Sequence, residues 1–405
     1  MERSSAHVSL DVIYPPPDRS WDSAPPTPEP QCARAPVPPV SLAACLALGS
    51  IGLLIIGVMP LLLGELVAEG RITGEAAGSL VTVELLAIAA GSVAGLRMLG
   101  GLRAKLVVAA GGAVVLAANL LALTSMSWLL LACGRGAAGF GEGILIAPAT
   151  VAIARLQRPE RAAAAYLAVQ TLLQFLVAAV TPRLVWQGSL AKGAMLLLGA
   201  SGCVAMALAV FLPATLRPTT HEEGHGPIPG RGFAALLCAG LFQGAITATW
   251  GYFAIVLSVW GYPSTDQASM VALSLAAQIT GALIAMGTGA PRSNRAMLMA
   301  GSCCMAMLVV NLMLFGTHHV VAWSFSALFG FLWLYTSPML TGLLVQVDPQ
   351  RRAVMYQAPS QLAGAALMPL CAGAVVASAG LKGALGVGVA GFLAAALLAG
   401  SLKTR

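Results

Sequence analysis

Three acidic residues and one arginine lie inside runs of apolar residues, where charged side chains are costly. These residues are Glu65, Glu84, Arg135 and Glu142. Apolar surroundings favour the protonated form of a carboxylate, and a neighbouring cation favours the ionised form. Such groups can take up and release a proton inside an apolar medium. We therefore expect a charge network that couples proton movement to another process. The alternative for each carboxylate is that a hydrogen bond neutralises it, or that it faces a wet cavity without such a role.

Arg135 and Glu142 lie in the stretch 129–148, LLLACGRGAAGFGEGILIAP. Seven positions separate them, so on a helix they share a side but lie roughly 10 Å apart along the axis. A tight pair between them is therefore not expected. Arginine does not readily lose its charge, so a carboxylate on another helix, such as Glu84, or a carbonyl or water would complete Arg135. The alternative role for Arg135 is structural, holding helices together.

Five glycines surround these two charges, where an ordinary helix prefers alanine or leucine. Gly139 and Gly143 have the G-x-x-x-G spacing that lets membrane helices approach closely. We expect them to pack against a neighbouring helix.

The composition places these residues in a membrane. The 405-residue chain is 58% hydrophobic and only 9% charged, whereas a soluble domain carries about 25% charged residues. The apolar runs reach the length of about 20 residues that crosses a bilayer core.

Basic residues are scattered singly or in pairs, which argues against nucleic-acid binding despite the net charge of +7. The eight cysteines form no C-x-x-C or Cys/His cluster, so no metal site is expected.

The expected fold is an all-α integral membrane protein with twelve transmembrane helices. The predicted spans of the first half are 41–67, 76–97, 104–124, 128–154, 162–182 and 193–213, and those of the second half are 233–258, 267–288, 296–315, 319–345, 353–377 and 383–402. The predicted domains are a disordered, Pro-rich cytoplasmic tail (1–40), a six-helix bundle (41–213), a cytoplasmic linker (214–232) and a second six-helix bundle (233–405).

The basic residues orient these spans. Loops on the side of the termini hold fourteen lysines and arginines, and the opposite loops hold four: Arg71, Arg183, Lys192 and Lys382. The positive-inside rule predicts that both termini are cytoplasmic. We expect a multi-pass protein of a bacterial inner membrane.

The two halves share short sequence matches at nearly one spacing. Pro159, Arg161 and Tyr166 match Pro349, Arg351 and Tyr356 at an offset of 190, and Glu75 matches Asp266 at an offset of 191. Six spans is an even number, so two copies would insert in the same orientation. Parallel repeats of this kind place a substrate site between the halves, near the middle of the membrane.

Local motifs add to this architecture. Arg135, Gly139 and Gly141 form an R-x-x-x-G-x-G pattern in span four, and a P-x-R turn ending at Arg161 follows that span. With this architecture and these motifs, the chain resembles the major facilitator superfamily (MFS) of secondary transporters.

The resemblance implies a role in proton transfer for Arg135. The family's G-x-L-a-D-r-x-G-r-k loop corresponds to residues 94–106, where Gly101 and Arg103 match but Met98 occupies the aspartate position. Together with Arg161 and Arg351, these two form the expected gating loops. The fifth-helix antiporter motif G-x-x-x-G-P-x-x-G-G is absent.

Neutral polar and aromatic residues are the candidates for a substrate cavity: Gln170, Gln174, Trp250, Tyr252, Gln278, Tyr335 and Gln361. A cavity lined in this way suits a weakly polar or aromatic organic molecule. Packing or anchoring at the membrane interface is the alternative for each of them.

We therefore expect a transporter of a small organic molecule, coupled to protons by symport or antiport. It would act as a monomer in the lipid bilayer, with no cofactor beyond the proton gradient. The direction of transport stays open. One alternative is a transporter-like sensor or scaffold without flux. A membrane enzyme is less favoured, because the chain has no HExxH, GxSxG or P-loop motif.

Overall fold

A computed structural model describes residues 38–402, except 126, 157–158, 214–215, 217–227, 288–292 and 351; the side chains of residues 100–101, 159–165 and 355 are also left out. The predicted tail therefore lies outside the described residues up to residue 37, as does most of the predicted linker. Helix α1 begins at Pro39 and helix α8 at Gly230, slightly before the predicted bundle boundaries.

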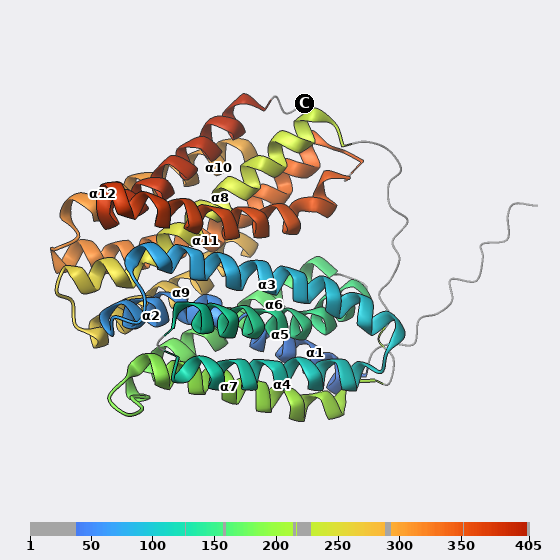
Figure 1. Cartoon of the computed structure of the whole chain (residues 1–405). Helices are drawn as coiled ribbons and strands as arrows, with labels where there is room; N and C mark the ends of the chain where they lie inside the picture. Colours follow the sequence, from blue (N-terminus) through green and yellow to red (C-terminus); the bar gives the residue numbers. More distant parts are fainter. Residues whose placement is uncertain are drawn as a thin grey trace, which may run out of the picture. The chain divides into compact units, whose positions relative to one another are not determined.

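The described chain is helical, with one isolated bridge between Trp186 and Ser189 (Figure 1). The α-helices are α1 (Pro39–Ile51), α2 (Leu54–Ala68), α3 (Gly74–Gly101), α4 (Ala104–Leu123), α5 (Trp128–Ala154), α6 (Pro159–Val180), α7 (Leu190–Leu208), α8 (Gly230–Val259), α9 (Ser264–Gly287), α10 (Asn294–Phe315), α11 (His319–Val347) and α12 (Gln357–Ser401). Short 3₁₀ turns lie at η1 (Thr181–Arg183), η2 (Ala209–Phe211) and η3 (Ala353–Tyr356).

Ten helical segments of the described chain are long and apolar enough to cross a membrane, counting α1 and α2 as one segment. The 45 residues of α12 are interrupted at Gly380, whose φ of 66° and ψ of −171° are not helical. Glycine adopts this backbone conformation because it has no Cβ. The all-helical membrane character expected from composition is confirmed.

Several helices of the C-terminal half begin at a constant spacing from helices of the N-terminal half. Helices α3 and α4 begin at residues 74 and 104, and α9 and α10 begin 190 residues later, at 264 and 294. Helices α5 and α11 each contain a proline, Pro148 and Pro338, which are also 190 positions apart.

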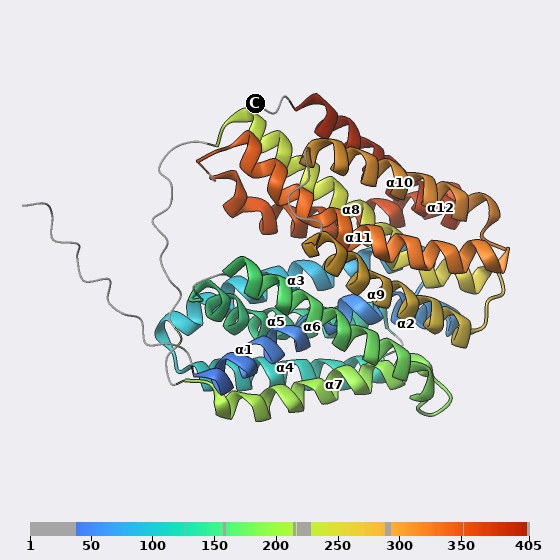
Figure 2. The same cartoon turned by 180° about the vertical axis from the view of Figure 1, so that it is seen from behind.

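The buried apolar side chains form two clusters. One is built mainly from the N-terminal half, α1–α7, and the other mainly from the C-terminal half, α8–α12. Figures 1 and 2 show α4, α5 and α7 together on one side of the bundle, and α8, α10 and α12 on the other. Helix α1 begins and α12 ends at the same end of the bundle, on the right in Figure 1. We call this end the termini face, and the other end the opposite face.

Candidate functional site

The charged residues of the N-terminal half meet in a buried cluster between α3, α4 and α5. Arg135 of α5 donates from Nε to Glu84 Oε2 of α3 at 3.3 Å, and its Nη2 also pairs with Glu84 Oε1. Its Nη1 donates to Asn119 Oδ1 of α4 at 2.7 Å. Arg135 is fully buried, and Glu84 and Asn119 are 3% and 1% exposed. The guanidinium therefore joins three helices.

Glu142 contacts this cluster more loosely. Its Oε1 lies 4.0 Å from Arg135 Nη2, and its Oε2 has no hydrogen-bond partner among the described residues. The residue is 2% exposed. Glu84 is thus the close partner of Arg135, and Glu142 is a second carboxyl group two helical turns further along α5.

Glycines explain how α5 comes close enough to its neighbours for these contacts. A Cβ at Gly139 would lie 2.5 Å from the Glu84 carbonyl oxygen, and one at Gly143 would lie 2.6 Å from Ser92 N; both neighbours belong to α3. On another side of α5, a Cβ at Gly141 would lie 2.7 Å from the Gly111 carbonyl oxygen of α4. Such distances exclude a side chain, so these three positions hold α5 directly against two helices. Around the axis of α5, Arg135 and Glu142 lie on the side between the face that contacts α3 and the face that contacts α4.

A broken helix lies beside this cluster. The first span is interrupted between α1 and α2 at Gly52 and Leu53. Gln174 of α6 donates from Nε2 to the Leu53 carbonyl oxygen at 2.6 Å. Gln170, one turn earlier on α6, is 7% exposed, and its Oε1 lacks a hydrogen-bond partner in the described part of the chain. Both predicted cavity residues therefore lie within the N-terminal half, and Gln174 contacts the break directly.

Trp250 and Tyr252 of α8 hold the two halves together. Pro60 cannot donate a backbone hydrogen bond to Ile56, the residue four positions before it. Trp250 Nε1 donates to that Ile56 carbonyl oxygen at 2.8 Å. The hydroxyl of Tyr252 donates to Gly74 O and accepts from Gly78 N, both at 3.0 Å. Both side chains are buried and bonded across the halves.

Two further contacts join the halves. Thr82 of α3 donates to the Ala366 carbonyl oxygen of α12 at 2.6 Å, three positions before Pro369, which lies inside that helix. A Cβ at Gly64 of α2 would lie 3.0 Å from the Cβ of Ala254 of α8. Each contact between the halves named here lies between the middle of the bundle and the opposite face.

The remaining predicted residues do not gather at one place. Gln278 is buried, Tyr335 is half-buried and stacks on Phe331 at 5.4 Å, and Gln361 and Glu65 are half-buried. Arg103 is exposed before α4, and Gly101 lies in the last turn of α3. Arg351 and the side chain of Arg161 lie outside the described residues. Four depressions in the described part of the chain, of about 140 to 780 Å³, are lined by other residues.

Asn119 and Thr82 were not predicted. Asn119 is the one amide side chain in the apolar run 104–123, and that was the available signal. Thr82 carries no such signal, because threonine is common in apolar helices. Within the described residues, no group of three histidine, cysteine or acidic side chains is placed to hold a metal ion.

Comparison with known proteins identifies the fold. No family model and no curated protein matches the sequence. Among solved structures, a bacterial homologue of the human lysosomal transporter Spinster, inward-facing and unoccupied, matches with a TM-score of 0.68 and 13% identity over 90% of this chain and 98% of that one. The nucleoside transporter NupG matches with a TM-score of 0.71 and 10% identity, also over 90% and 98%. The human organic anion transporter MFSD10 (TETRAN) matches with a TM-score of 0.59 and 18% identity over 89% and 99%.

At these identities the likeness establishes a common fold. The chain therefore shares the fold of these three transporter structures, in agreement with the resemblance that its motifs indicated.

Proposed function

We propose that this chain is a proton-coupled secondary transporter of a small organic molecule, working by alternating access between two six-helix halves. The observation that carries this proposal is the buried cluster of Arg135, Glu84 and Glu142, enclosed by apolar helices in a chain with a transporter fold. A charged cluster inside a membrane is costly and marks a functional site by default.

We infer twelve spans in two parallel repeats. Ten apolar segments, the 22-residue helix α6 and the division of α12 at Gly380 together give that number. The offset of 190 between α3 and α9, and between α4 and α10, supports duplication. The fourteen-to-four distribution of basic residues supports a cytoplasmic termini face.

Alternating access would require the halves to separate at the opposite face. The contacts of Trp250, Tyr252 and Thr82 hold that face closed, so this arrangement fits a state open toward the termini face. An inward-facing structure of the Spinster homologue matches the chain, which supports the same interpretation.

The charge balance of the cluster supports the proposal of proton coupling. One guanidinium faces two carboxyl groups, so the cluster is neutral when one carboxyl carries a proton and has one excess negative charge when neither does. Glu142 holds Arg135 loosely, and its Oε2 has no hydrogen-bond partner among the described residues, so we assign it as the proton acceptor. Glu84 would hold Arg135 throughout, and proton loss from Glu142 would draw the guanidinium toward it.

The test uses purified chain reconstituted into vesicles that contain a pH-sensitive dye. A panel of nucleosides, organic anions and neutral aromatic compounds is added in turn under an imposed pH gradient. We expect at least one compound to produce a proton flux, and we expect Glu142→Gln to lower that flux by about tenfold or more, the scale of losing a positioned proton acceptor. Glu75→Gln is the matched control, because Glu75 is an exposed carboxylate at the start of α3.

Substrate uptake that is indifferent to the pH gradient would exclude proton coupling while leaving transport intact. Binding without flux, detected by tryptophan fluorescence, would instead favour a sensor. Equal loss in Glu75→Gln and Glu142→Gln would remove the assignment of Glu142.

A further inference from the structure

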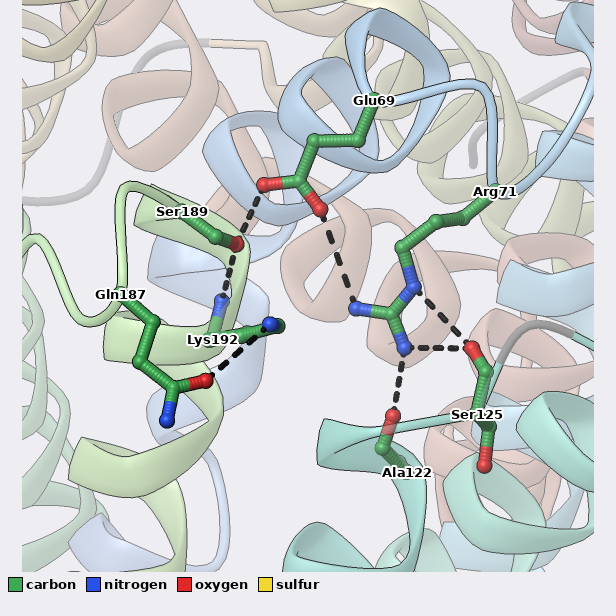
Figure 3. Close-up of polar contacts among 7 residues, drawn as sticks. All are labelled: Glu69, Arg71, Ala122, Ser125, Gln187, Ser189 and Lys192. Carbon is green, nitrogen blue, oxygen red and sulfur yellow. Dashed lines mark hydrogen bonds and ion pairs between the residues drawn. The ribbon is translucent and has the colours of Figure 1, made fainter.

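A second polar site lies at the opposite face of the N-terminal half, away from the charge cluster. It is a depression of about 410 Å³ lined by Glu69, Arg71, Leu123, Thr124, Gly188, Ser189 and Lys192. The depression brings together the loop between α2 and α3, the end of α4 and the start of α7. Figure 3 shows its polar side chains.

Arg71 fastens the end of α4. Its Nε and Nη2 donate to the Ser125 carbonyl oxygen at 3.1 and 2.7 Å, and Nη2 also donates to Ala122 O at 2.6 Å. A cation at a helix C-terminus satisfies carbonyl groups that the helix leaves free. The side chain is 3% exposed, yet Nη1 has no hydrogen-bond partner within the described chain; its nearest carboxylate oxygen, Glu69 Oε2, lies 3.9 Å away.

The C-terminal half makes the same fastening with a neutral group. Tyr262 lies 191 positions after Arg71, and its hydroxyl donates at 2.8 Å to the carbonyl oxygen of Gly316, which lies 191 positions after Ser125. A hydroxyl is therefore sufficient to fasten a helix end at this place in the fold. Burial lowers the pKa of Arg71, and Glu69 only partly opposes this, so the charge has a cost. The fastening does not explain why the N-terminal half carries a cation with a spare N–H.

A second cation faces the same space. Lys192, in the first turn of α7, is half-buried, and within the described residues its ammonium group donates to Gln187 Oε1 at 3.3 Å. Figure 3 shows its ammonium group and Nη1 of Arg71 on two sides of one gap. Glu69 is engaged: Oε1 accepts from the Ser189 hydroxyl, and Oε2 faces Arg71. Two cations and one carboxylate leave a net charge of +1, and the N-terminus of the 19-residue helix α7 adds a favourable dipole for an anion.

Tryptophans place this depression at the membrane surface. Trp186, in the turn that contains Gly188, is 51% exposed, and Trp128, which begins α5 next to the end of α4, is 39% exposed. Exposed tryptophans at the ends of spans lie at the level of lipid headgroups. Every phospholipid carries an anionic phosphate group at that level.

We propose that this depression binds the phosphate group of a phospholipid from the leaflet at the opposite face, with Lys192 and Nη1 of Arg71 as donors. The bound headgroup would connect α7 to the end of α4. This site does not depend on transport activity.

The test is a lipid titration of the purified full-length chain in detergent, followed by native mass spectrometry. The probes are phosphatidylglycerol, a diacylglycerol with the same acyl chains, and inorganic phosphate. We expect phosphatidylglycerol to bind about tenfold more tightly than diacylglycerol, and Lys192→Gln to remove most of that difference, because a charge-assisted hydrogen bond to phosphate is lost. Lys382→Gln is the matched control: Lys382 lies 190 positions after Lys192 and is exposed.

Three results would overturn the proposal. The first is equal binding of the two lipids. The second is a result that does not single out Lys192: phosphatidylglycerol binding is unchanged in Lys192→Gln, or it falls equally in Lys382→Gln. The third is displacement of phosphatidylglycerol by low millimolar inorganic phosphate, which would assign the site to a soluble phosphate.

Discussion

At the scale of single residues, the charge cluster shows why a membrane chain keeps an arginine between helices. Arg135 is fully buried, and its donors reach Glu84 and Asn119 on two other helices. A buried pair gains little over a well-packed apolar pair, but removal of one partner leaves an uncompensated charge. The cluster is therefore sensitive to single substitutions and tolerant of paired ones.

This sensitivity predicts a non-additive double-mutant cycle. Arg135→Gln should lower the free energy of unfolding by about 3–5 kcal/mol, because Glu84 and Glu142 then lack their cation. The double variant Glu84→Gln/Arg135→Gln should lose less than the sum of the two single changes, by about 1–3 kcal/mol. Unfolding in mixed micelles with increasing dodecyl sulfate measures these values. Additive losses would mean that Arg135 and Glu84 do not stabilise one another in the folded chain.

The residues of this cluster were only partly predictable from sequence. Charges inside apolar runs stand out locally, so Glu84, Arg135 and Glu142 were found. Which carboxylate Arg135 contacts depends on the register of α3 against α5, and spacing along one helix does not determine that register. Glu84 was named as one of several possible partners because Arg135 needs a partner on another helix, whereas Asn119 was missed because one amide in an apolar run is a weak signal.

At the scale of helices, small residues set the spacing of the bundle. Gly139 and Gly143 face the backbone of α3, and Gly141 faces that of α4. Close approach of backbones is the usual basis of helix association in membranes, where the lipid is as apolar as the side chains. The glycines of α5 thus determine whether Arg135 can reach Glu84 at all.

We expect a single methyl group at this contact to destabilise the bundle. In Gly143→Ala the new Cβ would overlap Ser92 N and the neighbouring backbone of α3, which should cost about 1–3 kcal/mol as overpacking. Gly386→Ala is the matched control, because a Cβ at this helical glycine meets nothing within 4 Å. Detergent melting temperatures of the two variants provide the comparison. Equal melting temperatures would show that α3 and α5 separate without cost.

Helix positions were predicted better than their interruptions. The predicted span 104–124 agrees with α4, and 128–154 agrees with α5. The interruption at Gly380 falls between the predicted spans 353–377 and 383–402, whereas the break at Gly52 and Leu53 was not predicted. Hydropathy averages over about a full span, so it identifies membrane helices but not a local change of φ and ψ in one of them.

At the scale of the whole molecule, the two halves meet through polar contacts at helix irregularities. Trp250 donates to a carbonyl freed by Pro60, and Thr82 donates to a carbonyl close to Pro369. A carbonyl released by a proline in a membrane needs a partner. The two donors belong to opposite halves, so the opening proposed above would have to exchange these bonds for water or other donors. Such bonds suit an interface that separates and closes repeatedly.

A cross-link across this interface should stop transport by the mechanism proposed above. In a background without native cysteines, Gly64→Cys/Ala254→Cys joins α2 to α8, since a Cβ at Gly64 lies 3.0 Å from the Cβ of Ala254. The control pair Ala122→Cys/Gly134→Cys joins α4 to α5 within the N-terminal half, at 3.1 Å. Both sites lie within reach of a disulfide after a small adjustment.

Oxidation should abolish substrate flux in vesicles for the pair between the halves, and reduction should restore it. The control pair should keep most of its flux when oxidised, because both of its cysteines move with one half. Cross-linking efficiency is read from peptide mass spectrometry of the same samples. Full flux through a completely cross-linked Gly64→Cys/Ala254→Cys chain would mean that the halves do not separate at this face. The contacts of Trp250 and Tyr252 would then be permanent, and the substrate would need a path that leaves them intact.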